Sequence, residues 1–107
     1  MTEREMLELA AKACGIDYLT QEEGTVIAWR GREPCAWNPL HNAADCADME
    51  ARLMIDVMWQ EHGVLAGDGV EFCHEPFDAH NNDRQLARMM ASTRSAAALA
   101  GVKNEDR

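Results

Sequence analysis

Residues 64–73 read VLAGDGVEFC and predict a β-hairpin. The flanking segments 64–66 and 70–73 are rich in residues that favour strands. Between them lies the GDG sequence of residues 67–69, and glycine accepts the positive φ angles that tight hairpin turns require. A turn this short joins only antiparallel strands, so the hairpin predicts an antiparallel sheet.

The N-terminal third predicts further strands of the same kind. Residues 16–19 and 25–30 are short β-prone runs on either side of a polar turn, which is typical of a hairpin. Residues 35–37 then provide a return strand, which must end before Pro39 because proline cannot donate a hydrogen bond to a neighbouring strand.

Three helices are predicted around these strands, each with apolar residues at helical intervals. They span residues 2–14, 42–60 and 82–101, with Thr2, Asn42 and Asn82 as the expected N-caps. In the third helix, Arg84 and Arg88 are predicted to face solvent.

The predicted fold class is α+β, a small antiparallel sheet with three helices. A chain of 107 residues is long enough for one core, so we expect a single domain over 1–101 and a polar C-terminal tail over 102–107. Whether the helices cover one face of the sheet or both, as a three-layer α/β/α sandwich, stays open.

The second predicted helix carries more apolar surface than one core contact needs. Cys46, Leu53 and Val57 form its core stripe, and Ala51, Met54, Ile55 and Met58 widen the apolar arc. Trp59 falls near its polar side. This pattern predicts either that the helix lies between two layers of the same chain or that it contacts a partner, most simply a second copy in a two-fold dimer.

The net charge of −9 is concentrated in the middle of the chain. Residues 33–78 carry ten acidic side chains and one basic side chain, Arg52, which makes −9 for this segment alone. Such a field repels nucleic acid, so we expect no direct nucleic-acid binding, and the simplest role of the charge is solubility. With no signal peptide and no membrane-spanning run in the sequence, we expect a cytoplasmic protein that does not bind membranes.

The potentially reactive residues form no recognised motif. The four cysteines, Cys14, Cys35, Cys46 and Cys73, include no CxxC pair, and no histidine stands at the short spacing of a structural zinc site. No phosphate-binding loop or hydrolase elbow occurs. We therefore expect reduced cysteines, no metal, no cofactor and no catalytic residues.

Residues 37–40 read Trp-Asn-Pro-Leu, and a helix bearing Asp45 is predicted to follow them. This arrangement, with an alanine-rich last helix, resembles the phage ABA sandwich domain family over about residues 3–100. The family's acidic turn is matched here only by Asp45. The resemblance implies a phage or prophage origin and a three-layer α/β/α arrangement, and it brings no established activity.

Two interpretations of the W-N-P-L motif stay open. Proline at position 39 holds Asn38 extended, and Trp37 can cover the corner where the chain enters the helix, which is a structural role. Alternatively, Trp37, Asn38 and Asp45 bind a partner. The candidate interaction surface is therefore Trp37, Asn38, Asp45, Met54, Met58 and Trp59.

Three functions follow from these observations. The first is a phage or prophage accessory protein that acts without catalysis, by contacting another protein or itself. The second is an acidic mimic of nucleic acid that inhibits a DNA-binding host protein, and the third is a small hydrolase.

Overall fold

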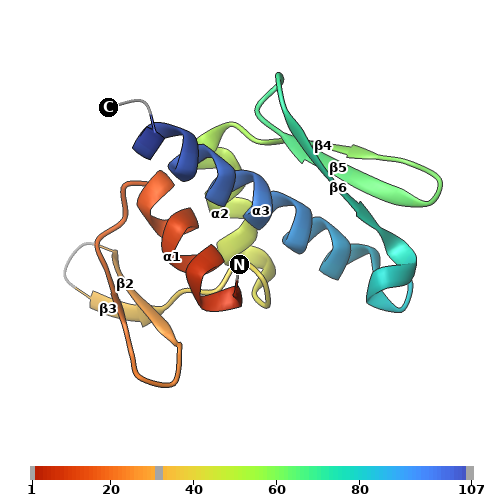
Figure 1. Ribbon diagram of the computed structural model, residues 1–107. Helices are drawn as coiled ribbons and strands as arrows, with labels where there is room; N and C mark the ends of the chain where they lie inside the picture. The colour runs from red at the N-terminus through yellow and green to blue at the C-terminus, as the bar shows by residue number, and fades with distance from the viewer. Residues whose placement is uncertain (1, 31–32, 106–107) are drawn as a thin grey trace.

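The computed structural model describes residues 2–30 and 33–105 and confirms the α+β class (Figure 1). Three α-helices, one short 3-10 helix (η1) and two three-stranded sheets make up this part of the chain. Their order is α1 (Glu3–Ala13), β1 (Tyr18–Thr20), β2 (Val26–Arg30), β3 (Glu33–Ala36), α2 (Ala43–Leu53), β4 (Asp56–Trp59), β5 (Gly63–Gly67), β6 (Phe72–Pro76), η1 (Phe77–His80) and α3 (Arg84–Glu105).

The strands form two sheets instead of the single sheet predicted. One sheet has the order β1-β2-β3 and the other β4-β5-β6, and all neighbouring strands are antiparallel. Both predicted hairpins are present, β1–β2 and β5–β6. The third strand of the second sheet, β4, comes from a segment that we predicted to be helical.

The second helix was predicted to reach residue 60, and this is wrong beyond Leu53. Helix α2 begins as expected, because the side chain of Asn42 accepts a hydrogen bond from the backbone N–H of Asp45 at 3.0 Å. It ends where Met54 adopts the left-handed conformation, with φ 54°. Residues 56–59 then pair with β5, since a short apolar run satisfies a strand as well as a helix and the neighbouring strand decides between them.

The helices lie between the two sheets (Figure 1). Helix α1 packs against the first sheet through β1 and β2 and against α3, while α3 packs against β5 and β6 of the second sheet. The sheets are therefore the outer layers, whereas an α/β/α sandwich would place helices outside. Each sheet consequently has one face toward the helices and one face away from them.

Helix α3 is buried around most of its circumference. Its buried residues are mostly small: Ala87, Met89, Ala91, Ser92, Thr93, Ser95, Ala96, Ala97 and Ala100. Small side chains allow α1, α2 and the second sheet to approach the helix from different sides. Its N-cap is Asp83 and not Asn82, because Asp83 Oδ1 accepts the N–H groups of Gln85 and Leu86. The helix runs past residue 101, its predicted end, to residue 105.

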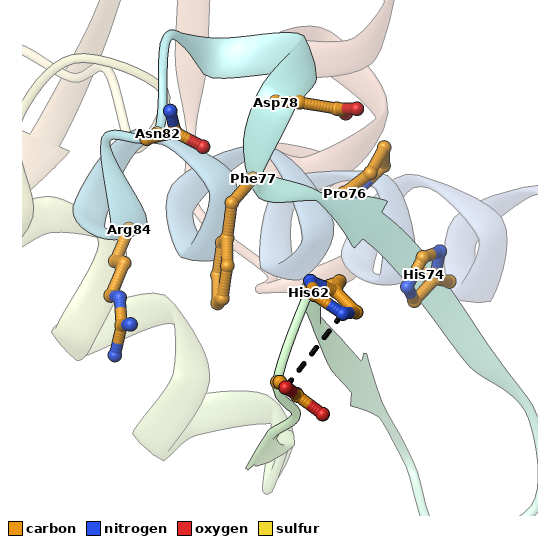
Figure 2. Close-up of a pocket in the computed structure, with 8 residues that line it drawn as sticks. His62, His74, Pro76, Phe77, Asp78, Asn82 and Arg84 are labelled. Atoms are coloured by element: carbon orange, nitrogen blue, oxygen red, sulfur yellow. Dashed lines mark ion pairs between the residues drawn. The ribbon is translucent and has the colours of Figure 1, made fainter.

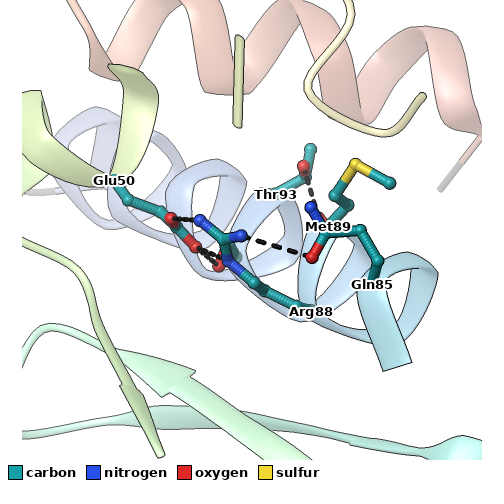
Figure 3. Close-up of polar contacts among 6 residues, drawn as sticks. Glu50, Gln85, Arg88, Met89 and Thr93 are labelled. Carbon is teal, nitrogen blue, oxygen red and sulfur yellow. Dashed lines mark hydrogen bonds and ion pairs between the residues drawn. The ribbon is translucent and has the colours of Figure 1, made fainter. Parts of the chain in front are cut away.

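An ion pair joins α3 to α2 (Figure 3). The Arg88 guanidinium donates to both carboxylate oxygens of Glu50, with Nε 3.1 Å from Oε2, and Ser92 Oγ donates to Oε2 at 2.6 Å. The hydrogen bonds with Glu50 raise the pKa of Arg88. Both side chains are largely enclosed. The prediction that Arg88 faces solvent is therefore wrong. These hydrogen bonds compensate for the burial of the Glu50 carboxylate.

Replacing Glu50 by alanine should strongly destabilise the protein. The substitution leaves the enclosed Arg88 without its carboxylate, a loss that costs about 3–5 kcal/mol for buried pairs. The matched control is Asp48→Ala on the same helix, which removes an exposed pair with Arg52 at 2.8 Å. That variant should lose at most about 1 kcal/mol. Urea unfolding followed by circular dichroism measures both, and equal losses would contradict a structural role for the Glu50–Arg88 pair.

Candidate interaction surface

The W-N-P-L segment forms a corner that is bonded within the chain. The Trp37 side chain is only 1% exposed, and Leu40 is buried as well. Asp45 Oδ2 accepts the backbone N–H of Asn38 at 3.0 Å, and Asn38 Oδ1 accepts that of Leu40 at 3.1 Å. These contacts match the structural interpretation of the motif. Trp37 and Asp45 lie in the interior and present no contact surface in this conformation.

The other three candidate residues are exposed, but they do not share a helix face. Met54 caps the end of α2, whereas Met58 and Trp59 belong to β4. Met58 is 42% exposed and Trp59 is 53% exposed. Because successive residues of a strand point to opposite faces, these two side chains lie on opposite sides of the second sheet. These positions therefore do not support the predicted dimer, which relied on one continuous apolar helix face.

The face of the second sheet that points away from α3 carries apolar side chains beside the carboxylate of Asp56. Met58, Leu65 and His74 are paired across the three strands and share this face, and Phe72 follows in the next row. On the opposite face Val64 and Ala66 are fully buried toward α3. We call Met58, Leu65, Phe72 and His74 the outer sheet face; in Figure 1 no helix of residues 2–30 or 33–105 packs on it.

Two glycines of the outer sheet face lie beneath side chains of the neighbouring strand. A Cβ atom at Gly63 would lie 2.5 Å from His74 Nε2, and one at Gly67 would lie 2.6 Å from Phe72 Cδ1. The imidazole and the phenyl ring therefore rest directly over glycine backbone on either side of Leu65. Sequence reasoning treated Gly67 only as part of a turn. The alternation of glycine at 63 and 67 with leucine at 65 was the signal that it missed.

The first sheet has an uncovered face of the same kind. Val26 and Ala28 point inward and are buried, so Leu19, Ile27 and Trp29 point outward. Leu19 is 57% exposed and Trp29 is 40% exposed. Uncovered apolar residues are thus a property of both outer layers.

A hollow of about 450 Å³ lies beside the second sheet, at η1 (Figure 2). Its lining is Glu61, His62, His74, Pro76, Phe77, Asp78, Asn82 and Arg84. The Arg84 guanidinium stacks on Phe77, 5.1 Å from the ring centre, and Trp59 packs against the same ring. In Figure 2, His62 and His74 lie on one side of the hollow and Arg84 lies on the other side of Phe77. The charged groups do not converge on one point.

A buried carboxylate, Glu75, holds three elements together. Glu75 of β6 accepts a hydrogen bond from Arg94 of α3 at 2.8 Å and bonds His80 of η1 at 2.7 Å. The imidazole of His80 is thus engaged in a structural contact. Within the described part of the chain, no cluster of three or more histidine, cysteine or acidic side chains could hold a metal ion.

Two of the four thiols are made less reactive by their surroundings. Burial, and then the nearby charge of Glu50, raise the pKa of Cys46 from 9.0 to about 12. Burial also raises the pKa of Cys73. A thiol that stays protonated at neutral pH is a poor nucleophile. None of the four cysteines takes part in a disulfide in the described residues.

Comparison of the chain with models of known protein families, with curated proteins and with solved structures finds no match. Among the described residues, no helix has the length and apolar character to cross a membrane. We therefore infer function from the geometry of the chain itself.

The Cys46 thiol should make folding stability depend on alkaline pH. Above pH 9.0 the thiol of the unfolded chain releases its proton, whereas the folded chain retains it up to about pH 12. Deprotonation thus favours the unfolded state, and the free energy of unfolding should fall as pH rises through this window. The Cys46→Ala variant should show a shallower fall between pH 9 and 11 in urea titrations. Parallel slopes for the two proteins would contradict the raised pKa.

Proposed function

We propose that this chain is a non-catalytic interaction module that acts through protein contact, with the outer sheet face as its contact surface. The observation that supports the proposal is the exposure of Met58 and Phe72 on a sheet face that no described helix covers. Exposed apolar patches on soluble domains are favourable sites for association, since binding removes them from water.

The chemistry of the outer sheet face suits a macromolecular partner. Rings fill the space above Gly63 and Gly67, and hollows of about 450 Å³ and about 300 Å³ lie beside His74 and Phe72. The side chains of this face are of the types that interfaces favour, because methionine adapts to different shapes and aromatic rings bury a large area. A protein partner fits this chemistry better than a metabolite.

The positions of the acids favour this proposal over nucleic-acid mimicry. Three of the ten acids in residues 33–78 are buried and bonded within the chain, Asp45 to Asn38, Glu50 to Arg88 and Glu75 to Arg94. Asp68 accepts the N–H groups of Val70 and Glu71 in its own turn, which lowers its pKa. A mimic needs acids displayed at phosphate-like intervals, and these acids serve the fold.

The cysteines do not favour the hydrolase alternative. A hydrolase would need an activated nucleophile, and the thiols with raised pKa, Cys46 and Cys73, do not supply one.

A phage or prophage origin, and with it a bacterial cytoplasm as the site of action, is part of the same proposal. Its support is the W-N-P-L resemblance.

Charge on the outer sheet face should abolish partner binding. Affinity capture from bacterial lysate with the wild type should recover a partner that Met58→Glu loses, because a carboxylate on an apolar interface must be desolvated. The matched control is Leu19→Glu, which places the same charge on a comparably exposed residue of the first sheet. Leu19→Glu should retain the partner, and high salt should not release it.

Two outcomes of this capture would contradict the proposal. If Leu19→Glu loses the partner and Met58→Glu retains it, the contact surface is the first sheet. If the captured protein binds DNA and is released at high salt, the acidic mimic gains support instead.

A further inference from the structure

Strand β4 is an open edge of the second sheet. It has substantial contacts only with β5, whereas the opposite edge strand, β6, also packs against α3 and η1. The Gln60 N–H donates to the Gly63 carbonyl at 2.9 Å, which directs the N–H and C=O groups of residues 56, 58 and 60 toward β5. By alternation, the N–H and C=O groups of Val57 and Trp59 point away from the sheet.

This edge, 4 residues long, has fewer of the features that usually prevent strand pairing than the edges of the first sheet. Natural edge strands carry lysine or proline, or are covered by another element. Strand β3 of the first sheet contains Pro34, and β1 has only 3 residues. Strand β4 contains neither proline nor lysine, and its one charged residue is Asp56.

We propose that β4 pairs antiparallel with β4 of a second copy of this chain, so that the two three-stranded sheets become one continuous sheet across a two-fold axis. The proposal rests on the interaction module argued above and names a second copy as its partner. It places the contact at the β4 edge of the outer sheet face, where Met58 belongs to both. The outward N–H and C=O groups of Val57 and Trp59 determine which residues of the two β4 strands pair. Val57 of one copy exchanges both backbone hydrogen bonds with Trp59 of the other, and symmetry repeats the exchange.

The side chains are compatible with this register. Met58 falls opposite Met58 of the second copy on the two-fold axis, so the two outer sheet faces become adjacent and the two methionines are in contact. Asp56 falls opposite the neutral amide of Gln60. The two Asp56 carboxylates are then four residues apart along the strands, about 14 Å at ~3.4 Å per residue. This separation exceeds the screening length of about 8 Å at physiological salt.

The overall charge predicts how the dimer responds to salt. Each copy carries a net charge of −9, so long-range repulsion opposes association although the edge itself has no like charges opposite each other. Added salt screens this repulsion. The dimer should therefore strengthen as ionic strength rises, which is opposite to the response of an interface held by ion pairs.

A disulfide trap tests the register. Met58→Cys in a Cys35→Ser background should form a covalent dimer in a glutathione redox buffer. A non-hydrogen-bonded pair places its Cα atoms about 4.5 Å apart, within the range that a disulfide spans. The Cys35→Ser change removes an exposed native thiol. The control is Gln60→Cys in the same background, which faces Asp56 of the second copy and should remain largely monomeric.

Sedimentation velocity tests the hydrogen bonds of the edge. Wild type should sediment as a dimer at micromolar concentration, and Val57→Pro should shift it to monomer, because proline removes an outward N–H and leaves the bonds to β5 in place. Leu19→Glu should stay dimeric. Far-UV circular dichroism checks the fold of each variant, and if Val57→Pro unfolds, the disulfide trap still decides.

Three results would overturn the β4 pairing. These are a wild type that is monomeric up to high micromolar concentration, equal trapping of both cysteine variants, and a dimer that Leu19→Glu dissociates. A monomeric wild type whose captured partner is lost only in Met58→Glu would overturn the second copy as partner and keep the interaction module. Loss of both the dimer and selective capture would remove both proposals.

Discussion

The burial of α3 on several sides is the constraint on which the rest of the structure depends. A helix in contact with α1, α2 and the second sheet must be built from small residues, which is why alanine and serine fill its buried positions. Its long polar side chains must also find partners. Arg84 stacks on Phe77, Arg88 binds Glu50 and Arg94 binds Glu75, so the helix is tied to η1, α2 and β6.

Helices in the middle leave both sheets as outer layers with one uncovered face each. This arrangement explains why exposed apolar residues occur on strands, as in Leu19, Trp29, Met58 and Phe72. The two sheets differ at their edges. The first is limited by Pro34 and by the short β1, whereas β4 leaves backbone donors and acceptors of Val57 and Trp59 unused by the sheet. That difference directs our functional inference to the second sheet.

The acid-rich middle of the chain is partly a structural feature. Glu50 and Glu75 each receive an arginine from α3, and Asp45 holds the turn that leads from β3 into α2. Composition alone assigns all these charges to the surface and to solubility. The folded chain instead uses several of them as hydrogen-bond acceptors at junctions between elements, where a bonded carboxylate is tolerated despite burial.

The sequence by itself determined the features that depend on neighbours only a few residues away. The α+β class, the two hairpins and the caps at Thr2 and Asn42 follow from turn residues and from side chains that bond backbone two or three positions ahead. Such contacts form in any tertiary context, so local patterns predict them.

Only the tertiary structure decided the features that depend on distant partners. Residues 54–60 fit a helix by periodicity, yet pairing with β5 makes part of this segment a strand. Arg88 fits a solvent-facing position until Glu50, 38 residues away, binds it. The division into two sheets with helices between them likewise follows from the packing of the first sheet on α1 and of the second sheet on α3. Contacts between distant segments leave no periodic signal in either segment, so no local pattern could have revealed them.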